Sequence, residues 1–290
     1  MIPVIICGGV GTKMWPESQP TSPKHFLPLI NGKSLFQINY ELLRTKFKPE
    51  EIYVSTNSVQ EELVIKNAPD LPKENIILEP ELRNHGPATG LVAAFLLKKG
   101  LGDEPFMLVQ ADVLREPGVK FIEMLDLGDN LIRKEKRLIT GGTKPDYAIM
   151  GIDYLIEGEK MTSMGDIGVS KVDKFLWRST KEAAEEYVKD GKALTHANHY
   201  GWTPNLLLQL YQKLKPEWYQ PLMNYVNGAD LTTEYAKMPK GPIEDVTQNV
   251  FTEALVVELP FAWIDFGTWE SVAKYIKEKN PNLIEIEGQN

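Results

Sequence analysis

The feature that most constrains the fold is a regular alternation of short apolar runs and longer helical patterns through the first 140 residues. The apolar runs predict strands, which we place at residues 2–6, 51–55, 75–78, 106–109 and 137–141. The segments between them carry apolar residues at helical spacing and predict helices at residues 34–47, 59–66, 87–99 and 119–133. Strands that alternate with helices indicate an α/β fold in which helices flank a mixed, mostly parallel sheet.

The second half of the chain is less regular. Extended segments are expected at residues 148–156 and 169–178, and a strong strand at residues 254–259. Helices are expected at residues 180–189, 204–214, 218–226, 233–237 and, capped by Thr268, at about 268–280. Because the chain contains no internal repeat, low-complexity tract or evident linker, we expect one domain over residues 1–290.

Composition narrows the class of protein. The net charge of −8 and the pI near 5.2 argue against a nucleic-acid partner, since no strongly basic block offsets the acidity. One cysteine, Cys7, excludes an intrachain disulfide framework and favours a reducing compartment. The first residues contain no signal-like pattern, and no apolar run approaches the length that crosses a bilayer. We therefore expect a cytoplasmic globular protein without a membrane partner.

A glycine-rich stretch at residues 7–16 directly follows the first predicted strand. Clustered glycines let the backbone turn sharply and bring several N–H groups close to a ligand. Such a group of N–H donors favours anions, above all phosphates. Lys13 and Lys24 add positive charge at the same place. The pattern predicts a polyphosphate-binding loop built from Gly8, Gly9, Gly11 and Thr12.

Two better-known phosphate loops do not fit this stretch. The dinucleotide fingerprint G-x-G-x-x-G requires a third glycine where Met14 stands. A Walker loop ending at residues 32–34 requires an upstream glycine where Leu27 stands. Residues 32–34 are more simply a turn that leads into the next helix.

Residues 8–18 and 23–29 instead carry a family pattern. They resemble the G-G-x-G-T-R-L-W-P-x-S and P-K-x-F-L-P-L signatures of sugar-nucleotide pyrophosphorylases, in particular the mannose-1-phosphate guanylyltransferase branch. Lys13 replaces the arginine of that signature and so keeps the charge without the bidentate fork. The resemblance implies a Rossmann-like, GT-A-like nucleotidyltransferase fold. It further implies a nucleotide-binding half at about residues 1–140 and a sugar-binding half at about 141–270, and it is compatible with a homodimer.

A second matching stretch, residues 79–88, resembles the E-P-x-x-R-N-T-A-P-A segment of the guanylyltransferases. By this resemblance Asn84 and the helix start at Pro87 and Ala88 contact the ribose or base of the nucleotide. The carboxylate of Glu79 matches the two adjacent donors of guanine, a pair that adenine lacks. An equally weighted alternative is that Glu79 caps the sheet edge or pairs with Arg83.

Asp112 and Asp265 each follow an apolar strand, where a carboxylate needs a partner or a bound cation. The family places metal-binding aspartates in its D-H and W-S-D-V-G-S-W motifs, and these two residues occupy the corresponding positions. Mg²⁺ prefers one or two carboxylates together with phosphate oxygens and water. The resemblance therefore implies a Mg²⁺ cofactor on Asp112 and Asp265, although the histidine of D-H is replaced by Val113.

The sugar-binding motifs are altered in this chain. The resemblance assigns the sugar phosphate to Gly151, Arg178, His196 and Asn198, but Trp177 replaces the glutamate of the family's F-x-E-K-P segment. His196 and its neighbour His199 are expected to be surface or hydrogen-bonding residues rather than metal ligands. Either the sugar differs from mannose, or this half of the chain no longer recognises a sugar.

The resemblance implies that a sugar-1-phosphate attacks the α-phosphorus of GTP or another nucleoside triphosphate and releases pyrophosphate. Catalysis in such a transfer is mainly positioning and charge stabilisation. Lys13, Lys24 and Asp112 are the implied catalytic residues: Lys13 at the β- and γ-phosphates, Lys24 near the α-phosphate, and Asp112 on the metal. Two alternatives stay open. One is a pyrophosphorylase for another base or sugar, and the other is a weakly catalytic regulatory subunit that binds nucleotide sugars.

Overall fold

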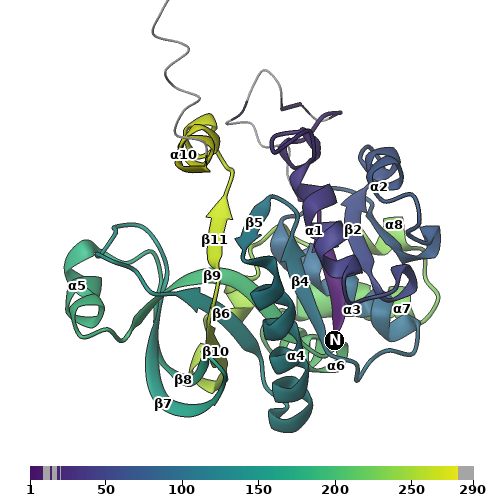
Figure 1. The fold of residues 1–290 in the computed structure, drawn as a ribbon. Helices are drawn as coiled ribbons and strands as arrows, with labels where there is room; N and C mark the ends of the chain where they lie inside the picture. The colour runs from purple at the N-terminus through teal and green to yellow at the C-terminus, as the bar shows by residue number, and fades with distance from the viewer. Residues whose placement is uncertain (9–13, 15–17, 20, 280–290) are drawn as a thin grey trace, which may run out of the picture.

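The computed structural model describes residues 1–8, 14, 18–19 and 21–279 (Figure 1). These residues form a nine-stranded sheet in the order β3-β2-β1-β4-β9-β6-β10-β8-β7. Its strands are β1 (Ile2–Ile6), β2 (Tyr53–Asn57), β3 (Ile76–Glu79), β4 (Phe106–Gln110), β6 (Ile139–Thr143), β7 (Tyr154–Met164), β8 (Ile167–Leu176), β9 (Ala193–Trp202) and β10 (Leu255–Glu258). A separate two-stranded sheet pairs β5 (Val113–Glu116) with β11 (Ala262–Asp265).

The helices are α1 (Leu35–Arg44), α2 (Glu61–Asn67), α3 (His85–Lys98), α4 (Gly118–Glu135), α5 (Lys181–Lys189), α6 (Pro204–Leu214), α7 (Pro216–Val226), α8 (Leu231–Tyr235), α9 (Glu244–Thr247) and α10 (Trp269–Lys279). Short 3₁₀ helices lie at Lys24–Phe26, Pro49–Glu51, Lys73–Asn75 and Phe251–Glu253. Ser34 caps α1 in a capping box with Gln37, as the sequence predicts.

Strands β1 to β4 form the parallel part of the sheet, with β1 between β2 and β4. Successive side chains on these strands point to opposite faces, so each strand contributes to two cores. Val4 packs with α3, α6 and α7 on one face, whereas its neighbour Ile5 packs with α1, α2 and α4 on the other. Figure 1 shows α4 in front of the sheet and α3 and α6 behind it. The predicted α/β architecture is confirmed.

Strand β9 lies in the middle of the sheet and is absent from the sequence-based prediction. It runs antiparallel to both β4 and β6 and joins the parallel part of the sheet to the second half of the chain. Its sequence, Ala-Leu-Thr-His-Ala-Asn-His-Tyr-Gly-Trp, contains few β-branched residues and two histidines, so its local β propensity is weak. The strand forms because pairing on both edges and burial of residues such as Trp202 outweigh that weak propensity.

Other elements also differ from the prediction. Strand β5 was missed because it is short and contains Arg115, which reads as a surface residue. Strand β7 begins at Tyr154 rather than at residue 148 and continues to Met164 through an exposed, charged stretch that lacks a hydrophobic pattern.

The pairing of β5 with β11 carries the chain end back to the centre of the molecule. Asp265 of β11 lies opposite Val113 of β5, and therefore next to Asp112. The following residue, Phe266, is fully buried against Met14 and Leu35 and anchors this segment. None of the helices formed by residues 1–8, 14, 18–19 and 21–279 is both long and apolar enough to span a membrane. The assignment of residues 1–290 to one domain with two halves stays a prediction.

Candidate active site

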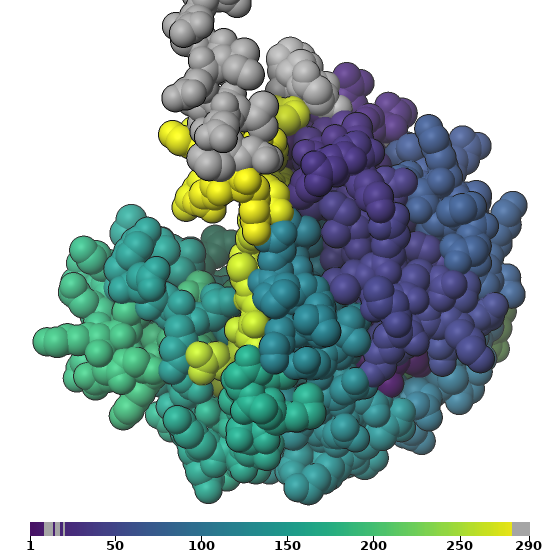
Figure 2. All heavy atoms as spheres, viewed as in Figure 1, coloured from purple at the N-terminus to yellow at the C-terminus, as the bar shows by residue number. Residues whose placement is uncertain are grey.

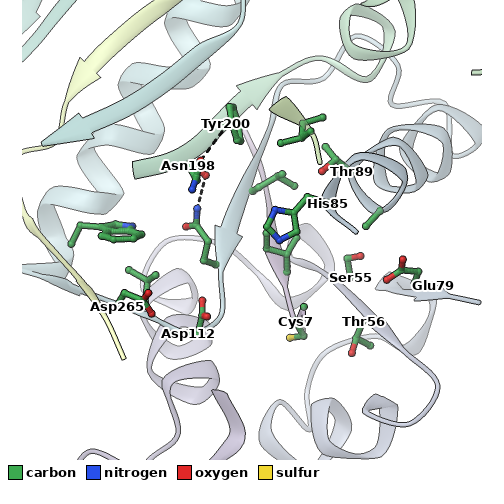
Figure 3. Close-up of a pocket in the computed structure, with 18 residues that line it drawn as sticks. Cys7, Ser55, Thr56, Glu79, His85, Thr89, Asp112, Asn198, Tyr200 and Asp265 are labelled. Atoms are coloured by element: carbon green, nitrogen blue, oxygen red, sulfur yellow. Dashed lines mark hydrogen bonds between the residues drawn. The ribbon is translucent and has the colours of Figure 1, made fainter. Parts of the chain in front are cut away.

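A cavity of about 280 Å³ opens beyond the carboxyl ends of β1, β2, β3 and β4 (Figure 3). This is the edge at which open α/β sheets bind ligands, and it is the edge that the sequence indicated. Strand β9 and the β5–β11 pair complete the wall. The polar residues that line it include Ser55, Thr56, Glu79, His85, Thr89, Gln110, Asp112, Asn198, Tyr200 and Asp265.

Asp112 and Asp265 line one wall of the cavity and form an ion triad with Lys24. The Lys24 ammonium lies 2.7 Å from Asp112 Oδ2 and 3.5 Å from Asp265 Oδ1. Burial opposes the charge on this lysine, but the two carboxylates outweigh that effect and raise its pKa above the ordinary value. Lys24 is therefore a charged ammonium at neutral pH, held by one carboxylate from the turn between β4 and β5 and one from the end of β11.

The positions of the two carboxylates also show whether a divalent cation could bind between them. Carboxylate oxygens of Asp112 and Asp265 reach the same positive group, so both can contact one cation from two sides. Figure 3 shows the two aspartates side by side at the cavity wall. Across the described part of the chain no group of three His, Cys, Asp or Glu side chains is arranged to hold a metal. A pair of carboxylates fits Mg²⁺ when substrate phosphates and water supply the remaining ligands.

The predicted phosphate loop is described only at its start. Gly8 follows β1 and lines the cavity. The other predicted loop residues, Gly9, Gly11, Thr12 and Lys13, lie outside the described residues.

Glu79 lines the far side of the cavity at the end of β3. Its Oε1 accepts hydrogen bonds from the Tyr235 hydroxyl at 2.7 Å and from the Arg83 backbone N–H at 3.1 Å. Burial raises the pKa of Glu79, and these two donors partly oppose the rise. The alternative that Glu79 caps the sheet edge or pairs with Arg83 agrees with this backbone contact. The Arg83 guanidinium binds Glu81 at 2.6 Å and the Ala236 carbonyl at 2.7 Å instead of Glu79.

The start of α3 lies beside Glu79. Asn84 is the N-cap of this helix, with φ 72°, and its Oδ1 accepts the His85 N–H at 2.8 Å. Ala88 lines the cavity, whereas Pro87 is buried and Asn84 is not among the lining residues. The structure therefore brings Ala88 to the cavity and gives Asn84 a capping role at its edge.

Among the predicted sugar-phosphate residues, Asn198 lines the cavity, and Gly151, Arg178 and His196 do not. Gly151 lies in an exposed turn with φ 80°. The backbone N–H of Arg178 donates to Asp153 Oδ1 at 2.7 Å, and its guanidinium stacks over the Trp177 ring. Their assignment to a sugar phosphate stays a prediction.

His196 and His199 are both buried in β9, so the expectation of surface histidines is wrong and that of hydrogen-bonding ones is confirmed. His196 Nε2 lies 2.9 Å from Thr140 Oγ1, and burial lowers the pKa of His196 to about 3. Burial, and then the nearby Arg115 charge, lower the pKa of His199. Both imidazoles are neutral at pH 7.

Sequence reasoning missed several residues of the cavity. Ser55 and Thr56 stand at the carboxyl end of a predicted strand, and this position was a usable signal. Gln110 stands at the end of another predicted strand and carried the same signal. Tyr200 carried no signal, because β9 itself was not predicted.

A sheet covered by helices on both faces, with a cavity and an acidic pair beyond the carboxyl ends of its parallel strands, is the arrangement in which open α/β proteins bind ligands. The chain belongs to the nucleotidyl transferase family, whose model matches residues 2–280.

Individual relatives agree with this family. The chain is 28% identical to a mannose-1-phosphate guanylyltransferase of Salmonella muenchen, over 99% of this chain and 62% of that protein. It is 29% identical to one of Klebsiella pneumoniae, over 94% of this chain and 59% of that protein. The chain thus spans about three fifths of the length of these relatives.

A solved structure is also similar. A Thermus thermophilus protein, described as a mannose-1-phosphate geranyltransferase, superposes with a TM-score of 0.80 at 25% identity, over 93% of this chain and 77% of that one. The resemblance to the mannose-1-phosphate guanylyltransferase branch is confirmed by these comparisons.

The buried His196 predicts a pH-dependent stability. In the folded state it stays neutral down to about pH 3, whereas in the unfolded chain it takes up a proton below about pH 6.5. The unfolded state therefore binds more protons, and stability falls as the pH decreases from 7 to 5. His196→Gln, measured by urea unfolding, should reduce this loss by about 2 kcal/mol.

Thr140→Val is the matched control, because it removes the hydrogen-bond partner and leaves the titrating ring. It should lower stability by about 1 kcal/mol while keeping the pH dependence. An unchanged pH dependence in His196→Gln would show that this histidine is not held neutral by the fold.

Proposed function

We propose that this protein transfers a nucleotidyl group from a nucleoside triphosphate to a sugar-1-phosphate, with GTP and mannose-1-phosphate as the preferred pair. The observation that carries the proposal is the convergence of Lys24, Asp112 and Asp265 at one wall of a cavity in a nucleotidyl transferase fold. An oxygen of the sugar phosphate forms a bond to the α-phosphorus of the triphosphate. The bond from that phosphorus to the β-phosphate oxygen breaks, and pyrophosphate leaves with the electron pair.

Each residue of the triad has a proposed role. Lys24 neutralises charge that develops at the α-phosphate, since its raised pKa keeps it protonated. Asp112 and Asp265 would hold Mg²⁺, which supplies positive charge to the phosphate oxygens. The loop of Gly8, Gly9, Gly11 and Thr12, with Lys13, is proposed to hold the β- and γ-phosphates. Because the triad orients groups and stabilises charge, the protein itself forms no covalent intermediate.

The base specificity rests on Glu79. Its Oε1 is held by Tyr235 and the Arg83 N–H, whereas Oε2 has no hydrogen-bond partner among the described residues. A carboxylate fixed in this way matches the adjacent N1–H and N2–H donors of guanine, which adenine does not offer. The names of the relatives, mannose-1-phosphate guanylyltransferases, support the same choice of base and sugar.

The sugar half supports a second candidate, a regulatory subunit that binds a nucleotide sugar without efficient transfer. It is favoured by the placement of Gly151, Arg178 and His196 away from the cavity wall. Location in the cytoplasm and assembly into a homodimer remain predictions from the sequence.

The deciding experiment measures pyrophosphate release with four nucleoside triphosphates and a set of sugar-1-phosphates that includes mannose and glucose, in the presence of Mg²⁺. We expect release with GTP and mannose-1-phosphate to exceed the other pairs. Release with a different pair would keep the transferase and correct the specificity. If no pair releases pyrophosphate but the protein still binds GDP-mannose in a calorimetric titration, the result would favour the regulatory subunit.

Glu79→Gln tests the base contact separately from the transfer. The amide keeps one acceptor oxygen but loses the negative charge. We therefore expect kcat/KM for GTP to fall about 10- to 100-fold, which corresponds to the loss of one charge-assisted hydrogen bond. The matched control is Glu81→Gln. Glu81 is two residues away, its side chain is half exposed, and it forms an ion pair with Arg83. Equal kcat/KM for GTP in wild type and Glu79→Gln would exclude Glu79 from base recognition.

A further inference from the structure

Strand β9 is interrupted by a bulge where it passes the cavity. Its register against β6 shifts between Thr140 and Gly142, so residues 197–199 lie opposite Gly141 alone. Asn198 at the apex has φ 51°, a left-handed conformation that asparagine tolerates better than most residues. The bulge turns the Asn198 side chain out of the sheet and into the cavity, where it lies 3.4 Å from the Tyr200 hydroxyl (Figure 3).

Two side chains hold the bulge from behind. Gln110 Nε2 donates to the backbone carbonyls of Asn198 at 2.5 Å and Ala197 at 3.4 Å. His199 Nδ1 lies 3.0 Å from the Ala197 carbonyl. Both contacts depend on which way the amide and the imidazole are oriented, because each ring or amide carries donors and acceptors on different atoms.

Arg115 fixes both orientations. Its Nη2 donates to Gln110 Oε1 at 2.7 Å, and its Nε donates to His199 Nε2 at 3.1 Å. A guanidinium has donors and no acceptor, so Gln110 must present its oxygen and His199 its unprotonated nitrogen. The NH₂ group of Gln110 and the Nδ1–H of His199 are thereby directed at the bulge.

The guanidinium itself is held in an unusual environment. Arg115 is 3% exposed, and its remaining hydrogen bonds go to Asn39 Oδ1 at 2.6 Å and to backbone carbonyls. It forms no ion pair with any carboxylate of the described residues, and burial lowers its pKa to about 9, an effect that the Asp112 charge partly opposes. An arginine buried in this way is expensive for stability, and such residues are retained where they specify one conformation.

We propose that Arg115 is a positioning residue for substrate binding, which acts through Gln110 and His199 to hold Asn198 in its left-handed conformation at the cavity. The ligand class is the anionic sugar-phosphate group, whose oxygens an asparagine amide can contact. The kinetic part of this inference rests on the proposed function.

The first test is a double-mutant cycle with Arg115→Lys and Asn198→Gly. Lysine keeps the charge but lacks the fork that reaches Gln110 and His199 together. Glycine removes the Asn198 side chain without straining a left-handed backbone. Each variant should raise KM for the sugar-1-phosphate about tenfold, which corresponds to about 1.4 kcal/mol, with kcat within about twofold of wild type. The double variant should be no worse than the more affected single variant.

Arg133→Lys is the matched control. Arg133 also bridges two side chains, Asp129 and Glu104, but it lies on the surface of α4 and far along the chain from the bulge. Its KM should equal that of wild type. Multiplicative effects in the double variant, or an unchanged KM in Arg115→Lys, would overturn the proposal.

The second test uses the wild-type protein and needs no activity. The ¹⁵N and ¹³C shifts of the His199 ring should report the Nδ1–H tautomer at neutral pH, with Nε2 as the acceptor. An Nε2–H tautomer would overturn the proposal, because Arg115 could then not donate to that atom. If the wild type releases no pyrophosphate with any substrate pair, the proposed function is wrong. The tautomer of the His199 ring would still test the role of Arg115, because its measurement does not depend on activity.

Discussion

The contact of Lys24 with Asp112 and Asp265 is the interaction on which the arrangement of the site depends. It joins three segments that are far apart in the sequence: the 3₁₀ turn Lys24–Phe26, the turn after β4, and the end of β11. The Lys24 side chain is largely buried, so loss of the two aspartates would leave its charge without a partner. The fold around the triad holds the three groups in contact.

Two features of the fold bring the triad together. Strands β1 and β4 are parallel neighbours, so the loop after β1 and Asp112 after β4 emerge at the same edge of the sheet. Strand β11 is about 150 residues away from β5 in the sequence, yet the two strands pair. Burial of Phe266 next to β11 fixes this segment in place. Figure 2 shows this C-terminal segment, in yellow, packed along the surface between the two parts of the molecule. The acidic pair is thus a consequence of long-range strand pairing.

The parts of the site that the sequence predicted follow from local rules. Asp112 and Asp265 were identified because a carboxylate directly after an apolar strand needs a partner, and Glu79 through the resemblance of residues 79–88 to a family segment. All three line the cavity. The parallel core was predicted because strands and helices alternate with clear periodicity. Gly8 and Lys24 were identified from a glycine-rich turn with nearby lysines.

The parts that were missed depend on contacts that no local pattern reports. Strand β9 forms through its pairing with β4 and β6, and without it Asn198 and Tyr200 have no place in the site. No sequence pattern indicated Arg115, because its partners, Asn39 and His199, come from other elements. The burial of His196 follows only from that unpredicted strand, so the sequence did not indicate it.

Whether Asp112 and Asp265 together hold one cation is tested by the binding of Mn²⁺, as a paramagnetic substitute for Mg²⁺, in the presence of GDP-mannose. Titrations followed by electron paramagnetic resonance compare wild type with Asp112→Asn and Asp265→Asn. If both carboxylates hold one cation, each variant should bind Mn²⁺ at least about tenfold more weakly than wild type. Wild-type affinity in either variant would contradict the account, because that aspartate would then serve only to pair with Lys24.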